Sequence, residues 1–325
     1  MSKETELWQD FPKTLPEFER RFSSESACRR YLMEARWGDR PRCGKCHHER
    51  VYELSNGLWD CSQCGHQTSL TSGTPMEGTR KDLRVWFRAI WEVVSRKNGI
   101  SAKDLQRVMG FGSYKTAWSW LHKIRRCLVR TEREPLRGSV QVDEGYVGGR
   151  GEGNQRGRSL EVKDLIMVAA EVGDGRVRLE HAPHADSRCA KEFLARHLAP
   201  DAAVTTDGGS HYNELALAGR THNAHIQTKS ASKKQDPLQL CHWTLSNLKR
   251  WWLGTHHGAI SSKHLQAYLD EFTFRHNRRK TKGVGRLVAR AIENLVAHVP
   301  VTMRQIIDLT KPCPHFAAGT PDLRG

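Results

Sequence analysis

Apolar residues recur with a helical period through the first third of the chain. Residues 24–35 carry apolar side chains three and four positions apart, and Ser24 can cap that helix. Residues 83–94 repeat the pattern, and two shorter helices are predicted at about 101–109 and 113–130. The N-terminal part of the chain is therefore expected to be largely helical.

The period changes to that of β-strands in the middle of the chain. Five alternating or β-rich runs are predicted as strands, at 138–147, 165–172, 177–181, 202–206 and 225–227. A helix over 187–198 separates the third strand from the fourth, and helices dominate from Lys229 to about residue 309. A meander followed by alternating helix and strand is typical of a mixed α/β layer fold.

These changes divide the chain into five predicted segments of an α/β multidomain protein. They are a helical lead-in at 1–40, a short turn-rich segment at 41–72, a helical region at 80–132, an α/β domain at 137–280 and a helical C-terminal tail at 281–325. A chain of 325 residues is long enough for two or more such domains.

The charge balance points to a polyanionic partner. Lys and Arg number 52 against 36 Asp and Glu, which gives a formal charge of +16. Nucleic acid is the usual partner of such a chain, although an anionic membrane or a merely basic surface would also account for the charge. No apolar run is long enough to span a bilayer, and residues 1–15 lack the apolar core of a signal peptide. We expect no membrane partner and a cytoplasmic, nucleoid-associated protein.

The cysteines indicate one metal site rather than disulfides. Five of the nine are isolated, and the other four form two close pairs, Cys43 with Cys46 and Cys61 with Cys64. Two such pairs can present four thiolates to one Zn²⁺, a closed shell whose role is structural. Gly44 and Gly65 stand where the turns need a permissive backbone. The segment 41–72 is therefore predicted to be a zinc ribbon that the metal folds.

A helix-turn-helix is predicted immediately afterwards. Ser101 resembles a helix cap, Gly110-Phe111-Gly112 makes a tight turn, and Ser113 caps a second helix. The polar face of this second helix is a candidate for entering a DNA major groove, with Lys115, Ser119, His122, Lys123, Arg126 and Arg130. An ordinary helical hairpin with a solvated basic face is the alternative. Arg278 and Arg279 are further candidates for phosphate contacts.

Two aspartates are candidates for a catalytic metal site. Asp143 lies on a predicted strand, on the opposite face from Val140 and Val142, and Asp207 ends another strand at a sharp turn. Carboxylates on adjacent strand ends can share two divalent cations for phosphoryl transfer. Taken singly, each Asp is more commonly a turn or cap residue. Glu144 faces the other side of its strand.

A third ligand is sought on the helix that begins near Cys241. Lys249 is a natural phosphate contact, and His242 shares its helical face because residues seven apart differ by only about 20°. Asn247 points nearly the opposite way. Helix geometry therefore favours His242 with Lys249, although Asn247 remains open.

The chain resembles the DDE-type transposases of bacterial insertion sequences, in the zinc-ribbon, ISXO-like group. The resembling stretches are Cys43–Cys46, Val142–Gly149, Thr206–Gly208, Ser246–Arg250, Gly254–Gly258 and Tyr268–Arg279. The resemblance implies a ribonuclease-H-like catalytic core, two Mg²⁺ or Mn²⁺ ions, and cut-and-join chemistry on double-stranded DNA. The DNA would be the terminal inverted repeats and the target, held by a homo-oligomer on paired ends.

The resemblance also assigns roles to single residues. Asp143 and Asp207 match the two acids of the family pattern and Lys249 matches its trailing lysine. His242 stands where the third acid is usually Glu, so it either binds metal or steers the nucleophile. Mn²⁺ accepts imidazole better than Mg²⁺ does. Two alternatives remain: a DNA-binding regulator with an inactive core, and a structure-specific nuclease on the same core.

Overall fold

The structure is a computed structural model of the chain. It describes residues 10–38, 40–130, 132–148, 163–213, 220–225, 236–258 and 260–308. The chain divides into two compact units. The ribbon unit contains residues 1–130 and 280–325, and the sheet unit contains residues 131–279.

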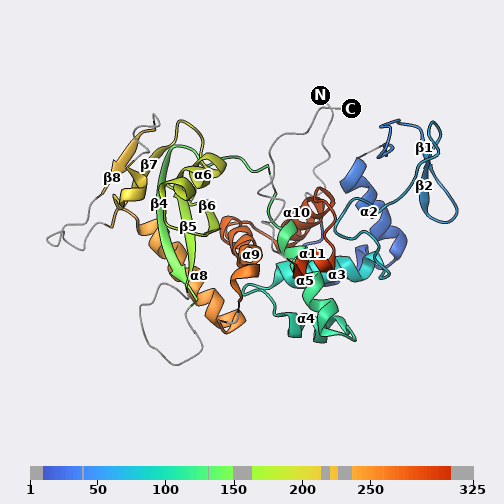
Figure 1. The fold of residues 1–325 in the computed structure, drawn as a ribbon. Helices are drawn as coiled ribbons and strands as arrows, with labels where there is room; N and C mark the ends of the chain where they lie inside the picture. The colour runs from blue at the N-terminus through green and yellow to red at the C-terminus, as the bar shows by residue number, and fades with distance from the viewer. Residues whose placement is uncertain are drawn as a thin grey trace. The chain divides into compact units, whose positions relative to one another are not determined.

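The ribbon unit is mainly helical, with one small sheet (Figure 1). Its helices are α1 (Leu15–Arg21), α2 (Glu25–Trp37), α3 (Leu83–Ser95), α4 (Ala102–Met109), α5 (Tyr114–Cys127), α10 (Val284–Val296) and α11 (Met303–Ile307). Its antiparallel sheet is formed by β1 (Val51–Glu53), β2 (Leu58–Cys61) and β3 (Gln67–Ser69), in that order.

Local signals set several helix boundaries in this unit. Ser24 accepts a hydrogen bond from the N–H of Ala27, which confirms the predicted cap of α2. Thr14 and Glu17 form a reciprocal capping box at the start of α1. Helix α2 ends at Gly38, whose φ of 65° lies in the left-handed region that favours glycine.

Helix α10 packs against α2, α3 and α5, so residues from the C-terminal part of the chain complete the core of the ribbon unit. The approach is close at Gly285. A Cβ at this position would lie 2.0 Å from the backbone oxygen of Pro12. Only glycine lets α10 lie this near the N-terminal segment.

The sheet unit is built on five strands in the order β6-β5-β4-β7-β8. They are β4 (Ser139–Val147), β5 (Asp164–Glu171), β6 (Val177–Ala182), β7 (Ala203–Thr206) and β8 (His222–Ala224). The first three pair antiparallel, whereas β7 pairs parallel to β4 and β8 parallel to β7. This is the ribonuclease-H-like mixed sheet that the resemblance implies. Strand β8 lies at 222–224, ahead of the predicted run at 225–227.

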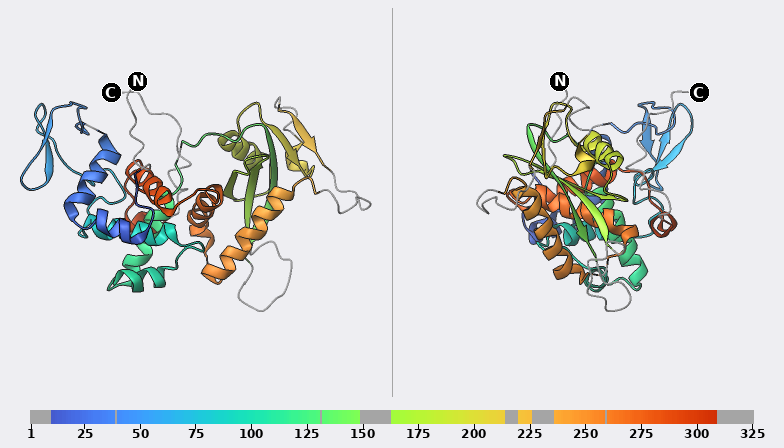
Figure 2. Two further views of the ribbon diagram at one scale, coloured as in Figure 1. Left: turned by 180° about the vertical axis from the view of Figure 1, so that it is seen from behind. Right: turned by 60° about the vertical axis from the view of Figure 1, so that its left-hand side comes forward.

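Helices cover both faces of this sheet (Figure 2). Helix α6 (Ser187–His197) packs on one face, while α8 (Gln239–His256) and α9 (Leu265–Asn277) pack on the other. Two short 3-10 helices, Ser210–Tyr212 and Ser262–His264, complete the described elements. The predicted fold class is confirmed: a multidomain α/β protein with an N-terminal cysteine cluster, a mixed sheet and helices at the C-terminal end.

Candidate active site and metal centre

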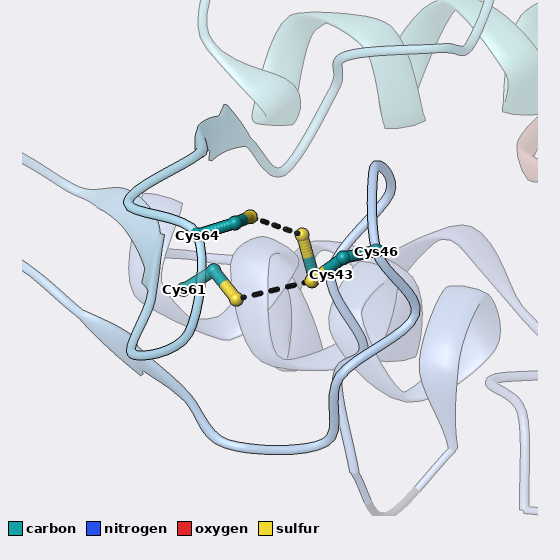
Figure 3. A group of neighbouring side chains, drawn as sticks. All are labelled: Cys43, Cys46, Cys61 and Cys64. Atoms are coloured by element: carbon teal, nitrogen blue, oxygen red, sulfur yellow. Dashed lines mark hydrogen bonds between the residues drawn. The ribbon is translucent and has the colours of Figure 1, made fainter.

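The four paired cysteines converge on one point in the ribbon unit (Figure 3). Their sulfur atoms all lie within 4.8 Å of one another, and the Cys43–Cys64 and Cys46–Cys61 sulfurs are each 3.6 Å apart. A tetrahedral Zn²⁺ with bonds of about 2.3 Å places its sulfur ligands about 3.8 Å apart. The cluster therefore fits a structural Zn²⁺, with every coordination position filled by a thiolate.

The two cysteine turns have matching backbones. His47 and Gly65 each follow the second cysteine of a pair, and their N–H groups donate to the carbonyl oxygens of Cys43 and Cys61 at 3.0 and 2.9 Å. Both adopt left-handed conformations, with φ of 58° and 63°. The prediction for Gly65 is correct, but the one for Gly44 is wrong. His47 takes the left-handed position in the first turn.

Asp143 lies within β4, on the face covered by α8. Val140 and Val142 belong to the core beneath α6, so Asp143 is on the opposite face of the strand, as predicted. Burial raises the pKa of the Asp143 carboxyl to about 6. The charges of Glu144 and Asp207 add to the rise, while the Glu144 N–H and the His242 charge oppose it.

Asp207 immediately follows β7, the strand next to β4. Ser139 pairs with Ala203 and Gln141 with Thr205, so the parallel register continued by two residues brings Asp207 alongside Asp143. The backbone N–H of Gly209 donates to Asp207 Oδ1 at 2.9 Å, which holds the exposed carboxylate in a tight turn. Sheet register, rather than sequence proximity, thus brings the two aspartates to one edge.

Glu144 links β4 to the segment that follows Asp207. Its Oε2 accepts a hydrogen bond from the Tyr212 hydroxyl at 2.8 Å and lies 3.3 Å from His211 Nε2. Tyr212 is fully buried, and burial together with the Glu144 charge raises the pKa of its hydroxyl strongly. The two adjacent acids of β4 thus lie on opposite faces of the sheet. Asp143 faces α8, and Glu144 contacts the segment that follows Asp207.

His242 projects from the first turn of α8 toward Asp143. Its Nε2 lies 3.3 Å from Asp143 Oδ2, and its Nδ1 lies 2.5 Å from Asp236 Oδ2. Asn247 and Lys249 are both exposed on the same helix, and Lys249 shares the helical face of His242. The structure brings His242, not Asn247, into contact with Asp143.

Close packing at Gly145 lets α8 reach this position. A Cβ on Gly145 would lie 2.7 Å from Leu245 Cδ1, so a larger residue would push α8 away from the sheet. Leu245 is one helical turn from His242 on the buried face of α8. The absence of a side chain at Gly145 therefore allows α8 to place His242 beside Asp143.

The geometry fits divalent cation binding at Asp143 and His242. Two neighbouring ligands of an octahedral ion with bonds of about 2.1 Å are about 3 Å apart, which is close to the observed 3.3 Å. Among the described residues, the four cysteines are the one group of three or more possible ligands gathered within 4.8 Å. Asp207, which the strand register places beside Asp143, is the further carboxylate at this edge of the sheet.

The two helices predicted at about 101–109 and 113–130 are present as α4 and α5, but the exposed face of α5 differs from the prediction. Helices α4 and α5 flank a turn in which Gly110 has a φ of 63°. Ser119, His122 and Arg126 are buried, so the expectation that they face solvent is wrong. The reason is that α5 packs against α10 and α11, which the local pattern of α5 does not reveal.

The remaining basic candidates differ in how far they are committed to protein contacts. Lys115 is exposed, whereas half-buried Lys123 donates to the Pro75 oxygen at 2.9 Å. Exposed Arg130 bonds to Asn294 Oδ1 at 2.8 Å. The Arg278 guanidinium lies 4.3 Å from the Phe274 ring centroid, and exposed Arg279 donates to the Gly175 oxygen at 3.2 Å. Lys115 is the candidate least tied to other residues by these contacts.

Two family models match the chain at the segments just described. Residues 23–67 match the transposase zinc-ribbon domain, and residues 135–277 match the ISXO2-like transposase domain. Over these two segments the chain is similar to zinc-ribbon, ISXO2-like transposases. The second match covers Asp143, Asp207, His242 and Lys249 in a single domain.

A relative from a mobile element points in the same direction. A protein from Halobacterium salinarum, described as an uncharacterized protein in transposable element ISH50, is 25% identical over 274 residues. The match spans 78% of this chain and 91% of that protein. The chain is therefore similar over most of its length to a protein of an insertion element.

A solved structure gives a weaker likeness. A chain in the cryoEM structure of a simian T-cell lymphotropic virus intasome, in complex with PP2A regulatory subunit B56 gamma, is 15% identical with a TM-score of 0.30. The match covers 52% of this protein and 67% of that chain. None of the described helices is long and apolar enough to cross a membrane.

Sequence reasoning missed two features of the candidate site. One is Asp236, whose signal is its place six residues before His242, just ahead of a predicted helix. The other is the linkage of Glu144 to His211 and Tyr212, which joins segments far apart in the sequence. No local pattern indicates this second contact.

Proposed function

We propose that the protein is an active DNA transposase that cuts the ends of its element and joins them to target DNA. The observation that carries the proposal is the meeting of Asp143 with His242 at 3.3 Å, beside the strand that delivers Asp207. The transposase domain match supports the same class of reaction. The substrate is double-stranded DNA, as terminal inverted repeats and as target.

Each residue of the site has a proposed role. Asp143 and His242 would hold a divalent cation, Mg²⁺ or Mn²⁺, and Asp143 and Asp207 would share the two ions of the site. Such ions supply the charge that activates the attacking water or 3′-hydroxyl and steadies the leaving oxygen. Lys249 lies on the helical face of His242 and would contact a phosphate of the bound DNA.

The same site would perform both steps. Asp143 and Asp207 first support hydrolysis at the element end, which leaves a free 3′-hydroxyl. They then support attack by that hydroxyl on a target phosphodiester, in line with the leaving oxygen. The ribbon and the helix-turn-helix would hold the terminal repeats, and two or more subunits would pair the ends.

A strand-transfer assay with labelled element ends and Mg²⁺ or Mn²⁺ tests the proposal. Asp143→Asn and Asp207→Asn are expected to abolish both cleavage and joining. Asp201→Asn changes an exposed acid just ahead of β7 and should leave both steps intact. Retention of joining by either of the first two variants would refute the assignment.

A second comparison tests the third position. His242→Ala is expected to lose activity, whereas Asn247→Ala, on the same helix but turned away, is expected to keep it. Product analysis separates the remaining alternatives. A nuclease would cut and never join, and a DNA-binding regulator would bind the repeats and do neither.

A further inference from the structure

The imidazole of His242 lies between two carboxylates. Asp236 Oδ2 is 2.5 Å from Nδ1, and Asp143 Oδ2 is 3.3 Å from Nε2. Asp236 lies just ahead of α8, and its other oxygen accepts the backbone N–H of Leu238 at 3.0 Å. Both oxygens of Asp236 are therefore engaged, one by the helix start and one by the histidine.

We propose that Asp236 is the positioning residue that makes His242 a metal ligand. The proposal rests on the function given above, because it assumes that His242 and Asp143 share a cation. An ionised carboxylate can only accept, so the hydrogen bond at 2.5 Å requires Nδ1 to donate. In the neutral ring this leaves a lone pair on Nε2, the atom that faces Asp143.

The resulting order, carboxylate then histidine then cation, also bears on the charge of the site. The family resemblance implies that a carboxylate is usual where this chain carries His242. A carboxylate on the outer nitrogen makes a coordinated imidazole more basic and fixes the orientation of its ring. Asp236 would thus supply a negative charge to the site through His242, without binding the ion itself.

The competing explanation is that Asp236 serves only to start α8. An Asp whose side chain accepts an N–H two residues later is common ahead of helices. In that case the contact with His242 would be incidental, and His242 would be a proton-bearing partner of Asp143 and Asp236. The two explanations predict different orders of metal affinity among variants at position 236.

The decisive pair is Asp236→Asn and Asp236→Ala. Asn retains an oxygen for the Leu238 N–H and turns an NH₂ donor toward Nδ1, which favours the ring form with its proton on Nε2. Ala removes both interactions and leaves Nδ1 to water. Metal affinity should therefore fall in the order wild type, Ala, Asn, whereas thermal stability should fall in the order wild type, Asn, Ala.

The measurement is Mn²⁺ binding by the zinc-loaded, full-length protein, followed by the electron paramagnetic resonance signal of free Mn²⁺. We expect losses of about tenfold for Asp236→Ala and approaching 100-fold for Asp236→Asn, as for other carboxylates that orient a metal-binding histidine. Equal affinity of wild type and both variants would overturn the proposal. So would an affinity that follows stability, with Asn above Ala.

The sheet unit provides a matched control. Asp164 Oδ1 lies 3.2 Å from His181 Nε2, which makes a second carboxylate–histidine pair. Asp164 pairs with Val147, four residues along β4 from Asp143, or about 13 Å at strand spacing. Asp164→Asn should leave Mn²⁺ binding unchanged.

Two further arms separate failure of this inference from failure of the proposed function. If Asp143→Asn weakens Mn²⁺ binding and the Asp236 variants do not, only the role of Asp236 is wrong. If Asp143→Asn has no effect either, the metal site itself is wrong. Nitrogen-15 spectra of labelled histidine, with His242 assigned through His242→Gln, should show the Nδ1–H form in the wild type and the Nε2–H form in Asp236→Asn.

Discussion

The zinc site and the proposed catalytic site of this protein are assembled in opposite ways. The four cysteines lie within a short ribbon, and their sulfurs already surround one point. Asp143, Asp207 and His242 come from β4, from the end of β7 and from α8. The first centre can organise its own segment of chain, whereas the second exists only after a whole sheet and its covering helix have formed.

The difference extends to what holds each region together. Strands β1 to β3 have three or four residues each, and nine of their ten positions are not buried, so the ribbon depends on its ion. The sheet unit has an apolar core on each face, beneath α6 and beneath α8 and α9. Loss of metal should therefore unfold the ribbon and leave the sheet unit standing.

Removal of zinc is the largest expected effect. Structural Zn²⁺ contributes about 10–16 kcal/mol of apparent binding free energy in small zinc domains. Cys61→Ser, or a strong zinc chelator, should make residues 41–72 sensitive to proteolysis while residues 163–213 stay protected. Cys189→Ser, at a partly exposed cysteine outside the cluster, is the control. Equal loss of protection in both regions would show that the sheet unit also depends on zinc.

The same contrast explains what the sequence could predict. The zinc ligands follow from spacing alone, because both pairs lie in local turns. Asp143 follows from strand alternation, and His242 follows from helical periodicity once Lys249 is chosen. Each of these inferences uses a period that a single element imposes.

Contacts between distant segments were not predictable in this way. Ser119, His122 and Arg126 look like a solvated face until α10 and α11 cover α5. Glu144 meets Tyr212, and Gly285 meets Pro12, only because the tertiary fold brings them together. Sequence periodicity shows which face of an element is polar, but not which later segment packs on that face.

Gly145→Ala should give the next largest effect, because it acts on the joint between sheet and helix. The added methyl group would lie 2.7 Å from Leu245, and overpacking of this kind costs about 1–3 kcal/mol. Displacement of α8 should also weaken Mn²⁺ binding through His242. Urea denaturation and Mn²⁺ titration measure the two effects.

A double variant tests the cause of that effect. Gly145→Ala combined with Leu245→Ala should restore part of the metal affinity, since the clash is removed. If the two substitutions are simply additive, close packing at Gly145 does not control the position of His242.

Tyr212→Phe should have a smaller effect, confined to the face of the sheet that α6 covers. It removes the 2.8 Å hydrogen bond to Glu144 and leaves a partly buried carboxylate with one partner fewer, which costs about 1–2 kcal/mol. Tyr146→Phe is the control on the same core, since no hydrogen bond involving the Tyr146 hydroxyl occurs among the described residues. Equal loss of stability in both variants would show that the hydrogen bond to Glu144 has no special role.

The last prediction concerns acid, which should weaken both regions for different reasons. Protonation of thiolates releases zinc from the ribbon. In the sheet unit, burial and the nearby charge of Arg279 lower the pKa of His276 to about 4 from its usual 6.5. The unfolded chain then binds more protons than the folded one between these values, so stability falls as pH drops from about 6.5 to 4.

His276→Gln should flatten this part of the stability curve of the sheet unit, measured by urea denaturation from pH 4 to 8, and leave the acid release of zinc unchanged. An unaltered slope in the variant would place the acid sensitivity of the sheet unit elsewhere.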